Sequence, residues 1–225
     1  MRTYTWDDYR AWPDDERWEI IGGEAYAMSP APSVRHQVIQ GNLFRALAAY
    51  FDGKPCRPLL APLDVKLSDL TVLQPDIAVV CRKEQLKRTH IEGAPALVVE
   101  IVSESSALRD RTLKMRAYAR HGIAEVWLVT PYPSVAEVFR LDGATYRLAG
   151  SYMRADTLKS PGFPKLRVKL EDVFDFPLDP DEKAAMAVRE GPAPAYGTKQ
   201  KRRGAKGKRC SRIPLRGVPD SERNR

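Results

Sequence analysis

Two carboxylates lie at the ends of neighbouring apolar runs of the sequence. Asp76 precedes the run Ile77–Val80, and Glu100 lies near the end of the run Ala96–Val102. Both runs are short and rich in β-branched residues, which predicts strands that are buried on both faces. If these strands pair antiparallel as neighbours, the start of the first lies opposite the end of the second. Asp76 and Glu100 are then side by side.

A divalent metal ion would neutralise such a pair of acids. A buried carboxylate without a partner costs several kcal/mol (roughly), so something must compensate its charge. Mg²⁺ prefers oxygen ligands and is often held by one or two carboxylates together with water and substrate phosphate. The alternative is that one or both acids bond to backbone amides or to an arginine at the strand ends. The spacing leaves both interpretations open.

A helix predicted over Val34–Phe51 brings a histidine toward the body of the protein. Ser33 is a candidate N-cap, and the apolar residues of the segment follow helical spacing on one face. His36 belongs to that face in the first turn. It is either a hydrogen-bonded core residue or a contact to substrate or to a ligand beside the metal.

A second helix, predicted from about Ala107 to His121, follows the Glu100 strand and is ended by a glycine. Lys114 lies on the face of this helix that can be aimed back at the two carboxylates. The alternative is a surface salt bridge between Asp110 and Lys114, which contributes only about 0.3–0.5 kcal/mol. Because the helix starts directly after the acid-bearing strand, we favour the first interpretation.

The remaining segments predict a mixture of short strands and one short helix. Gly22 and Gly23 form the turn of an N-terminal β-hairpin. The other predicted elements are a helix over Thr5–Trp12, a strand over Arg57–Leu67 with Asp64 near its centre, a charged loop over Arg82–Gly93, a buried strand over Glu125–Thr130, an outer meander around Asp142 and Gly143, and an extended piece over Leu158–Leu170.

Length and composition indicate one ordinary domain of a cytoplasmic protein. The chain has 225 residues, and it contains no apolar run of about 18 residues that could span a membrane. Its first residues lack the apolar segment of a signal peptide. The three cysteines, Cys56, Cys81 and Cys210, are far apart in sequence, which indicates neither a zinc site nor a disulfide framework.

The net charge of +8 is unevenly distributed. Residues 189–225 hold 12 lysines and arginines and 3 acids, a net charge of +9, whereas the other 188 residues hold 25 and 26, a net charge of −1. Residues 1–178 therefore form the predicted folded domain. Residues 179–225 are predicted to be a disordered basic tail, because they contain too few large apolar residues to form a core.

Several blocks of the sequence, taken in order, resemble a known nuclease family. They are Trp18–Glu24, Met28–Pro32 with His36, Pro75–Val80, Ala94–Ser103, Arg109–Arg111 with Lys114 and Tyr118, and Gly122–Val129. This combination is similar to the Uma-two family of restriction endonucleases, a branch of the PD-(D/E)XK nuclease superfamily. The resemblance runs from about Tyr4 to Phe176.

The resemblance implies an α/β (α+β) fold with a restriction-endonuclease-like core, in which helices flank a central mixed β-sheet, and a phosphodiesterase site that uses Mg²⁺ or Mn²⁺. Asp76 and Glu100 match the two acidic motif positions, and the backbone carbonyl of Ile101 is a further expected metal ligand. Val102 stands where the superfamily motif has lysine, and we expect Lys114 to substitute for it.

The same resemblance gives two assisting residues and the expected partners. Glu19 matches an N-terminal family acid that assists the metal or the attacking water, and His36 is an assisting candidate. The expected function is a metal-dependent endonuclease that hydrolyses DNA, with no membrane partner and with a homodimer as one arrangement. The alternatives are a decayed nuclease that only binds nucleic acid or protein, and a hydrolase of small phosphate esters.

DNA binding requires lysines and arginines that contact phosphate. Either the basic tail supplies them, or basic residues of the domain converge on one face: Arg57, Lys66, Lys83, Lys87, Arg88, Arg109, Arg111 and Arg116.

Overall fold

A six-stranded mixed sheet is the centre of the molecule in the computed structural model, which describes residues 2–13, 16–28, 31–103 and 107–177. Its strand order is β11-β10-β9-β8-β6-β3. The strands are β3 (Arg57–Leu60), β6 (Ile77–Val80), β8 (Leu97–Ile101), β9 (Glu125–Thr130), β10 (Val135–Asp142) and β11 (Thr145–Met153). β8 and β9 are parallel, and the other neighbours are antiparallel. The predicted central mixed sheet is confirmed.

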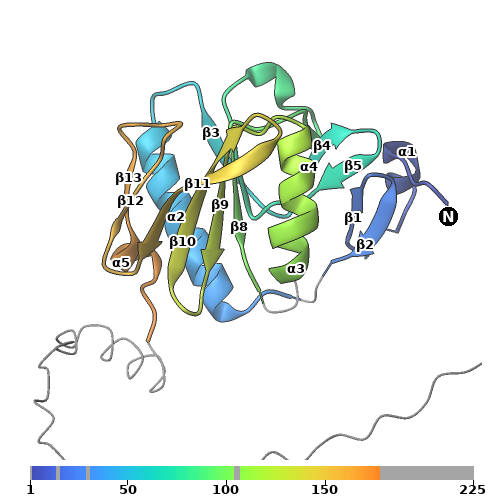
Figure 1. Ribbon diagram of the computed structural model, residues 1–225. Coiled ribbons are helices and arrows are strands. Elements are labelled where there is room, and N and C mark those ends of the chain that lie inside the picture. The colour runs from blue at the N-terminus through green and yellow to red at the C-terminus, as the bar shows by residue number, and fades with distance from the viewer. Residues whose placement is uncertain (1, 14–15, 29–30, 104–106, 178–225) are drawn as a thin grey trace, which may run out of the picture.

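Helices cover both faces of this sheet (Figure 1). On one face lies α2 (Val34–Phe51), which has the predicted bounds and the predicted cap at Ser33. On the other lies a helix made of three segments, α3 (Ala107–Arg109), the π-helix η2 (Asp110–Lys114) and α4 (Met115–Arg120). The side chains of β8 alternate between the two layers, as period-2 geometry requires.

The alternation is visible in the two apolar clusters on either side of β8. Val99 packs with residues of α2, such as Leu43, whereas Val98 packs with Tyr118 of α4. All five residues of β8 are buried. The prediction that the two acid-bearing strands are covered on both faces is therefore confirmed.

A second, five-stranded sheet of order β2-β1-β5-β4-β7 packs against the edge of this core. Its strands are β1 (Trp18–Ile21), β2 (Glu24–Ala27), β4 (Asp64–Ser68), β5 (Thr71–Leu73) and β7 (His90–Glu92). β1 and β2 form the predicted hairpin, in which Gly22 and Gly23 both have positive φ. The short helix α1 (Trp6–Tyr9) begins at a capping box made by Thr5 and Asp8, and it is shorter than predicted.

The last part of the domain lies beside α2. The strands β12 (Thr157–Lys159) and β13 (Arg167–Lys169) form a small hairpin, which leads directly into α5 (Leu170–Val173). Leu158, Val168 and Val173 bury their side chains in the same apolar cluster as α2. The segment predicted as an extended piece is therefore a hairpin and a helical turn.

Two sequence-based expectations for residues 57–93 were wrong. Arg57–Leu67 is not one strand, because the chain leaves the central sheet after β3 and enters the second sheet as β4. Pro62 lies in the break, where its missing N–H prevents a continuous ladder, and Asp64 is the first residue of β4 rather than its centre. The expected loop contains the 3₁₀ helix η1 (Lys83–Gln85) and β7, which pairs with β4.

The expectation that the cysteines form no disulfide was also wrong. Cys56 and Cys81 are joined by a disulfide bond, although 25 residues separate them. Antiparallel pairing of β3 with β6 sets Arg57 opposite Val80. Cys56 precedes Arg57 and Cys81 follows Val80, so the two cysteines lie opposite each other as well. The spacing of cysteines in a sequence does not show which of them are neighbours on paired strands. Because two of the cysteines are bonded, they give no support to the expected cytoplasmic location.

Two further expectations concern the membrane and the tail. Among the described residues, no helix is long and apolar enough to cross a membrane. The predicted basic tail, residues 179–225, lies outside the described residues.

Candidate active site

The register of β6 and β8 places the two predicted acids opposite each other. Ile77 pairs with Val99, so the preceding residue, Asp76, aligns with Glu100. The backbone N–H of Ile101 donates a hydrogen bond of 2.6 Å to Asp76 Oδ2. The prediction that the start of one strand meets the end of the other is confirmed.

His36 lies beside Asp76, at the first turn of α2. Its Nε2 is 3.1 Å from Asp76 Oδ1, and its side chain is 12% exposed. Gln40, one turn further along, donates from Nε2 to the carbonyl oxygen of Asp76 at 2.9 Å. The first two turns of α2 thus hold both the side chain and the backbone of Asp76.

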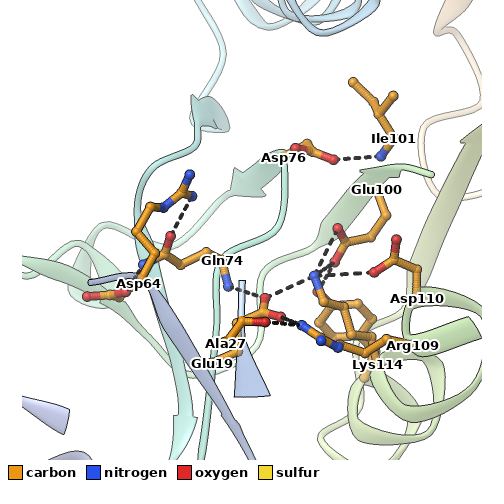
Figure 2. A network of polar contacts seen from close by, with 12 residues as sticks. Glu19, Ala27, Asp64, Gln74, Asp76, Glu100, Ile101, Arg109, Asp110 and Lys114 are labelled. Atoms are coloured by element: carbon orange, nitrogen blue, oxygen red, sulfur yellow. Dashed lines mark hydrogen bonds and ion pairs between the residues drawn. The ribbon is translucent and has the colours of Figure 1, made fainter. Parts of the chain in front are cut away.

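Lys114 reaches Glu100 from the face of the sheet opposite α2, and the ion pairs of the described residues include none between Lys114 and Asp76. Its ammonium is 2.9 Å from Glu19 Oε1, 3.2 Å from Glu100 Oε1 and 3.5 Å from Asp110 Oδ1. Figure 2 shows the ammonium between these three acids, which come from β1, β8 and η2. All four side chains are at least 94% buried.

The two interpretations of Lys114 are both partly realised. The lysine is aimed at the sheet, as predicted, and it also pairs with Asp110, but this pair is buried rather than on the surface. Asp110 and Lys114 begin and end the π-helical turn η2. The sequence predicted an uninterrupted α-helix, because a single wider turn leaves the apolar spacing on either side almost unchanged. π-Helical turns are frequent at functional sites.

Glu19 is fixed in place by groups on several sides. Its Oε1 accepts a hydrogen bond of 3.0 Å from the backbone N–H of Gln74. Arg109 approaches Oε2 to 4.0 Å and donates to the carbonyl oxygen of Ala27 at 2.9 Å. Glu19 is therefore the carboxylate that ties the second sheet to the lysine of the helix.

Three buried carboxylates share the ammonium of Lys114, and this crowding of acids shapes the protonation of the site. Burial raises the pKa of Glu100, Lys114 lowers it, and the charges of Asp110, Asp76 and Glu19 raise it further, so that it is well above the usual range. Burial lowers the pKa of Lys114, but Glu100, Glu19 and Asp110 outweigh burial and raise it well above its usual value. Lys114 therefore keeps its charge.

Tyr118 completes the surroundings of Glu100. Its hydroxyl donates a hydrogen bond to Glu100 Oε1, and burial together with the charge of Glu100 raises the pKa of the phenol. The phenol thus stays a donor. Tyr118, Asp110 and Gln74 were not among the predicted site residues. Helical spacing placed Tyr118 and Asp110 on the face of Lys114, which is the signal that could have identified them.

The departure at Val102 has a packing explanation. Val102 is 6% exposed and packs in the apolar cluster that includes Leu73 and Tyr118. A lysine at this position would have to place its stem in that cluster. The helix instead brings the ammonium of Lys114 to Glu100, and its replacement of the motif lysine stays a prediction.

The residues at the strand ends suit a hard cation. In the described part of the chain, no three side chains of His, Cys, Asp or Glu gather at metal-binding distances. The donor set implied by the sequence is smaller, namely the carboxylates of Asp76 and Glu100 with the carbonyl of Ile101. These are all oxygens, as Mg²⁺ prefers, and water and substrate can supply the other ligands.

A mixed sheet flanked by helices, with one acid before β6 and another in the adjoining strand β8, is a restriction-endonuclease-like α/β arrangement. The chain belongs to the Uma2 family, described as "Putative restriction endonuclease", whose family model matches residues 6–171. This places the protein in a nuclease family.

The chain is also similar to two known proteins. An uncharacterized protein of Synechocystis, slr1290, is 30% identical over 134 residues, which cover 57% of this chain and 69% of the relative. A crystal structure from Anabaena variabilis, described as a putative nuclease belonging to DUF820, superposes with a TM-score of 0.63 at 22% identity. The superposition covers 76% of this chain and 97% of that one, and it shows the shared fold.

Proposed function

We propose that the protein is a divalent-metal-dependent endonuclease that hydrolyses phosphodiester bonds of DNA. The observation that carries this proposal is the meeting of Lys114 with Glu100 at the strand end that also holds Asp76. The family description supports a restriction endonuclease, and hence DNA as the nucleic acid. Two further expectations stay predictions. One is a homodimer, which would bring two copies of the site to one duplex, and the other is a cytoplasmic location.

In this proposal Asp76, Glu100 and the carbonyl of Ile101 hold the metal, for which Mg²⁺ is the first candidate and Mn²⁺ the second. When bound, such an ion polarises the scissile phosphate, lowers the pKa of a bound water and stabilises the leaving oxygen. His36 fixes one oxygen of Asp76, and the N–H of Ile101 fixes the other. The ligand carboxylate is therefore oriented before a metal arrives.

Lys114 supplies the positive charge of the site. Its ammonium would orient the attacking water or offset the negative charge that develops on the phosphate in the transition state. Glu19 and Asp110 hold the ammonium next to Glu100 in the absence of substrate. Because these two acids also keep the lysine protonated, they preserve the charge on which its role depends.

A second candidate is a nuclease fold that binds nucleic acid without cleaving it. Two observations favour it: the carboxylate of Glu100 is already bonded to Lys114 and Tyr118, and the described residues hold no group of three metal-ligating side chains. In that case the buried acids and the lysine would only stabilise the junction of the two sheets.

Cleavage of duplex DNA by the full chain tests the proposal, with Mg²⁺, Mn²⁺ or EDTA present. The variants are Asp76→Asn, Glu100→Gln and Lys114→Met, and the matched control is Asp142→Asn, which changes an exposed acid on the outer meander. We expect each site variant to lose cleavage by about 10²-fold or more, and the control to cleave like the wild type.

Each outcome distinguishes the candidates. Metal-dependent cleavage that all three site variants lose supports the nuclease. Duplex binding without cleavage in any metal supports the binding module and overturns the nuclease. Turnover of small phosphate esters alone would also contradict the proposal.

A further inference from the structure

A cavity of about 540 Å³ lies between α2 and the segment β13–α5. Figure 1 shows these elements side by side, with α5 and the β12–β13 hairpin next to α2. Arg45 and Tyr50 line the cavity from α2, Arg167 and Lys169 line it from β13, and Asp172 lines it from α5. Three cations and one carboxylate thus line the same cavity.

The three cations differ from three of the eight basic residues that the sequence marked for DNA binding. Lys66 is 2.9 Å from Asp69, Arg111 is 2.7 Å from Glu137, and Arg109 is held by Ala27 and Glu19. In contrast, no ion pair within the described residues joins Arg45, Arg167 or Lys169 to a carboxylate. Their charge is available to a ligand.

Arg167 is also oriented in advance. Its NH1 donates hydrogen bonds to the carbonyl oxygens of Pro164 and Leu166, at 2.6 and 2.7 Å. These bonds fix the guanidinium while leaving its other nitrogens available as donors. A fixed guanidinium loses less conformational freedom on binding, and its planar fork matches the oxygens of phosphate.

The location is notable because the domain is otherwise almost neutral. Residues 1–188 carry 25 lysines and arginines against 26 acids, so three cations with one carboxylate around one cavity are a local excess of positive charge. Arg45 follows His36 by nine residues on α2, which corresponds to about 13 Å along the helix axis. The cavity is therefore separate from the acids at the strand ends.

We propose that this cavity binds phosphate groups of the nucleic-acid backbone, as a second contact away from the bond that is cut. The inference rests on the proposed function for the identity of the ligand. The cations supply charge-assisted hydrogen bonds to phosphate oxygens, and the volume admits more than one phosphate group. The contact supplies affinity without reading sequence.

The test compares two double variants of the full chain that change the net charge equally. Arg45→Glu with Lys169→Glu reverses two cavity cations that make no hydrogen bond in the described structure. Arg120→Glu with Arg147→Glu is the control, at two exposed residues of α4 and β11 that are not among the expected DNA contacts. Binding of a fluorescent 30-base-pair duplex is measured by anisotropy over a series of salt concentrations in EDTA, with thermal unfolding as a check of the fold.

We expect the cavity variant to lower the slope of log affinity against log salt by about 2, since each phosphate contact contributes about 0.9. Its affinity should fall at least about tenfold below that of the control variant. An unchanged slope, an equal loss in the control, or no duplex binding by the wild type overturns the inference.

A calorimetric titration with inorganic phosphate separates the two sources of this ligand. If phosphate binds the wild type and not the cavity variant, while duplex binding is unchanged, the cavity is a free-anion site and the nucleic-acid assignment is wrong. Cleavage is measured separately. A cavity variant that keeps the wild-type salt slope and cleaves normally refutes only this inference, and a chain that binds through the cavity without cleaving refutes only the proposed function.

Discussion

Two buried glutamates of this protein are stabilised in different ways. Glu125, at the start of β9, accepts hydrogen bonds from Trp127 Nε1 at 2.7 Å, Ser160 Oγ at 2.7 Å and the N–H of Gly162 at 2.6 Å, and Arg140 lies 3.9 Å from its Oε2. A Cβ at position 162 would lie 2.8 Å from Glu125 Oε2, so a side chain there would displace this carboxylate. Glu100 instead shares a single ammonium with Glu19 and Asp110.

The difference separates a structural acid from one that is ready for a ligand. Three short hydrogen bonds and the guanidinium of Arg140 stabilise the single carboxylate of Glu125. At Glu100, burial and the charges of Asp110, Asp76 and Glu19 raise the pKa, and Lys114 offsets them only in part. Burial alone therefore does not mark an active site. What distinguishes the two glutamates is whether the protein itself completes their neutralisation.

The largest effect on stability is expected from Lys114→Met. Removal of this ammonium leaves three buried carboxylates without their common partner, and breaking a buried ion pair typically costs about 3–5 kcal/mol. The free energy of unfolding, measured by urea denaturation in EDTA, should fall by an amount in this range.

The control for this prediction is Lys66→Met. Lys66 also lies between two acids, Asp69 and Glu92, but their side chains are 75% and 43% exposed. Its loss should change the free energy of unfolding by less than about 1 kcal/mol. Equal losses in the two variants would show that the buried cluster does not depend on its lysine.

An intermediate effect on the free energy of unfolding is expected when Glu125 or Glu100 is replaced by glutamine. Glu125→Gln loses charge-assisted bonds and sets an amide group against three donors, which should cost about 1–3 kcal/mol. Glu100→Gln removes a charge from a cluster that has too many acids, so the metal-free protein should be unchanged or more stable. Urea denaturation in EDTA measures both. A larger loss of stability in Glu100→Gln than in Glu125→Gln would contradict the distinction between the two glutamates.

The smallest effect, counted per pH unit, is the pH dependence of stability. Because the folded protein raises the pKa of Glu100 above the ordinary value of 4.5, the folded state binds this proton more tightly than the unfolded chain does. The free energy of unfolding of the metal-free protein should therefore fall as the pH rises above 4.5, by at most about 1.4 kcal/mol per pH unit.

Glutamine variants assign this pH dependence to a residue. Glu100→Gln should remove this contribution, and Glu125→Gln should leave it in place. Thermal or urea unfolding between pH 5 and 8 provides the measurement, and an identical profile for wild type and Glu100→Gln would refute the assignment.

Features encoded by local patterns were predictable from the sequence. The bounds of α2, the hairpin at Gly22 and Gly23, and the two strands around Asp76 and Glu100 all follow from periodicity and turn residues. The antiparallel register then follows from geometry, because neighbouring strands match in reverse order. The direction of Lys114 toward the acids follows from helical spacing.

Features that depend on distant partners were not predictable in this way. The disulfide between Cys56 and Cys81 depends on the pairing of β3 with β6. The burial of Asp110 depends on how the π-helical turn η2 packs against the sheet. The basic cavity joins Arg45 of α2 to Arg167 of β13, which no periodicity connects.

A lysine on β8 would be held at a constant distance from the acids by the backbone of the sheet. In this protein the ammonium belongs to a helix that packs on the sheet through side chains, and it is attached at the end of a π-helical turn. A slide of that helix by one residue, about 1.5 Å along its axis, would withdraw the charge while both acids stay in place. A contact on the outer surface of this helix could thus control the proposed hydrolysis without touching Asp76 or Glu100.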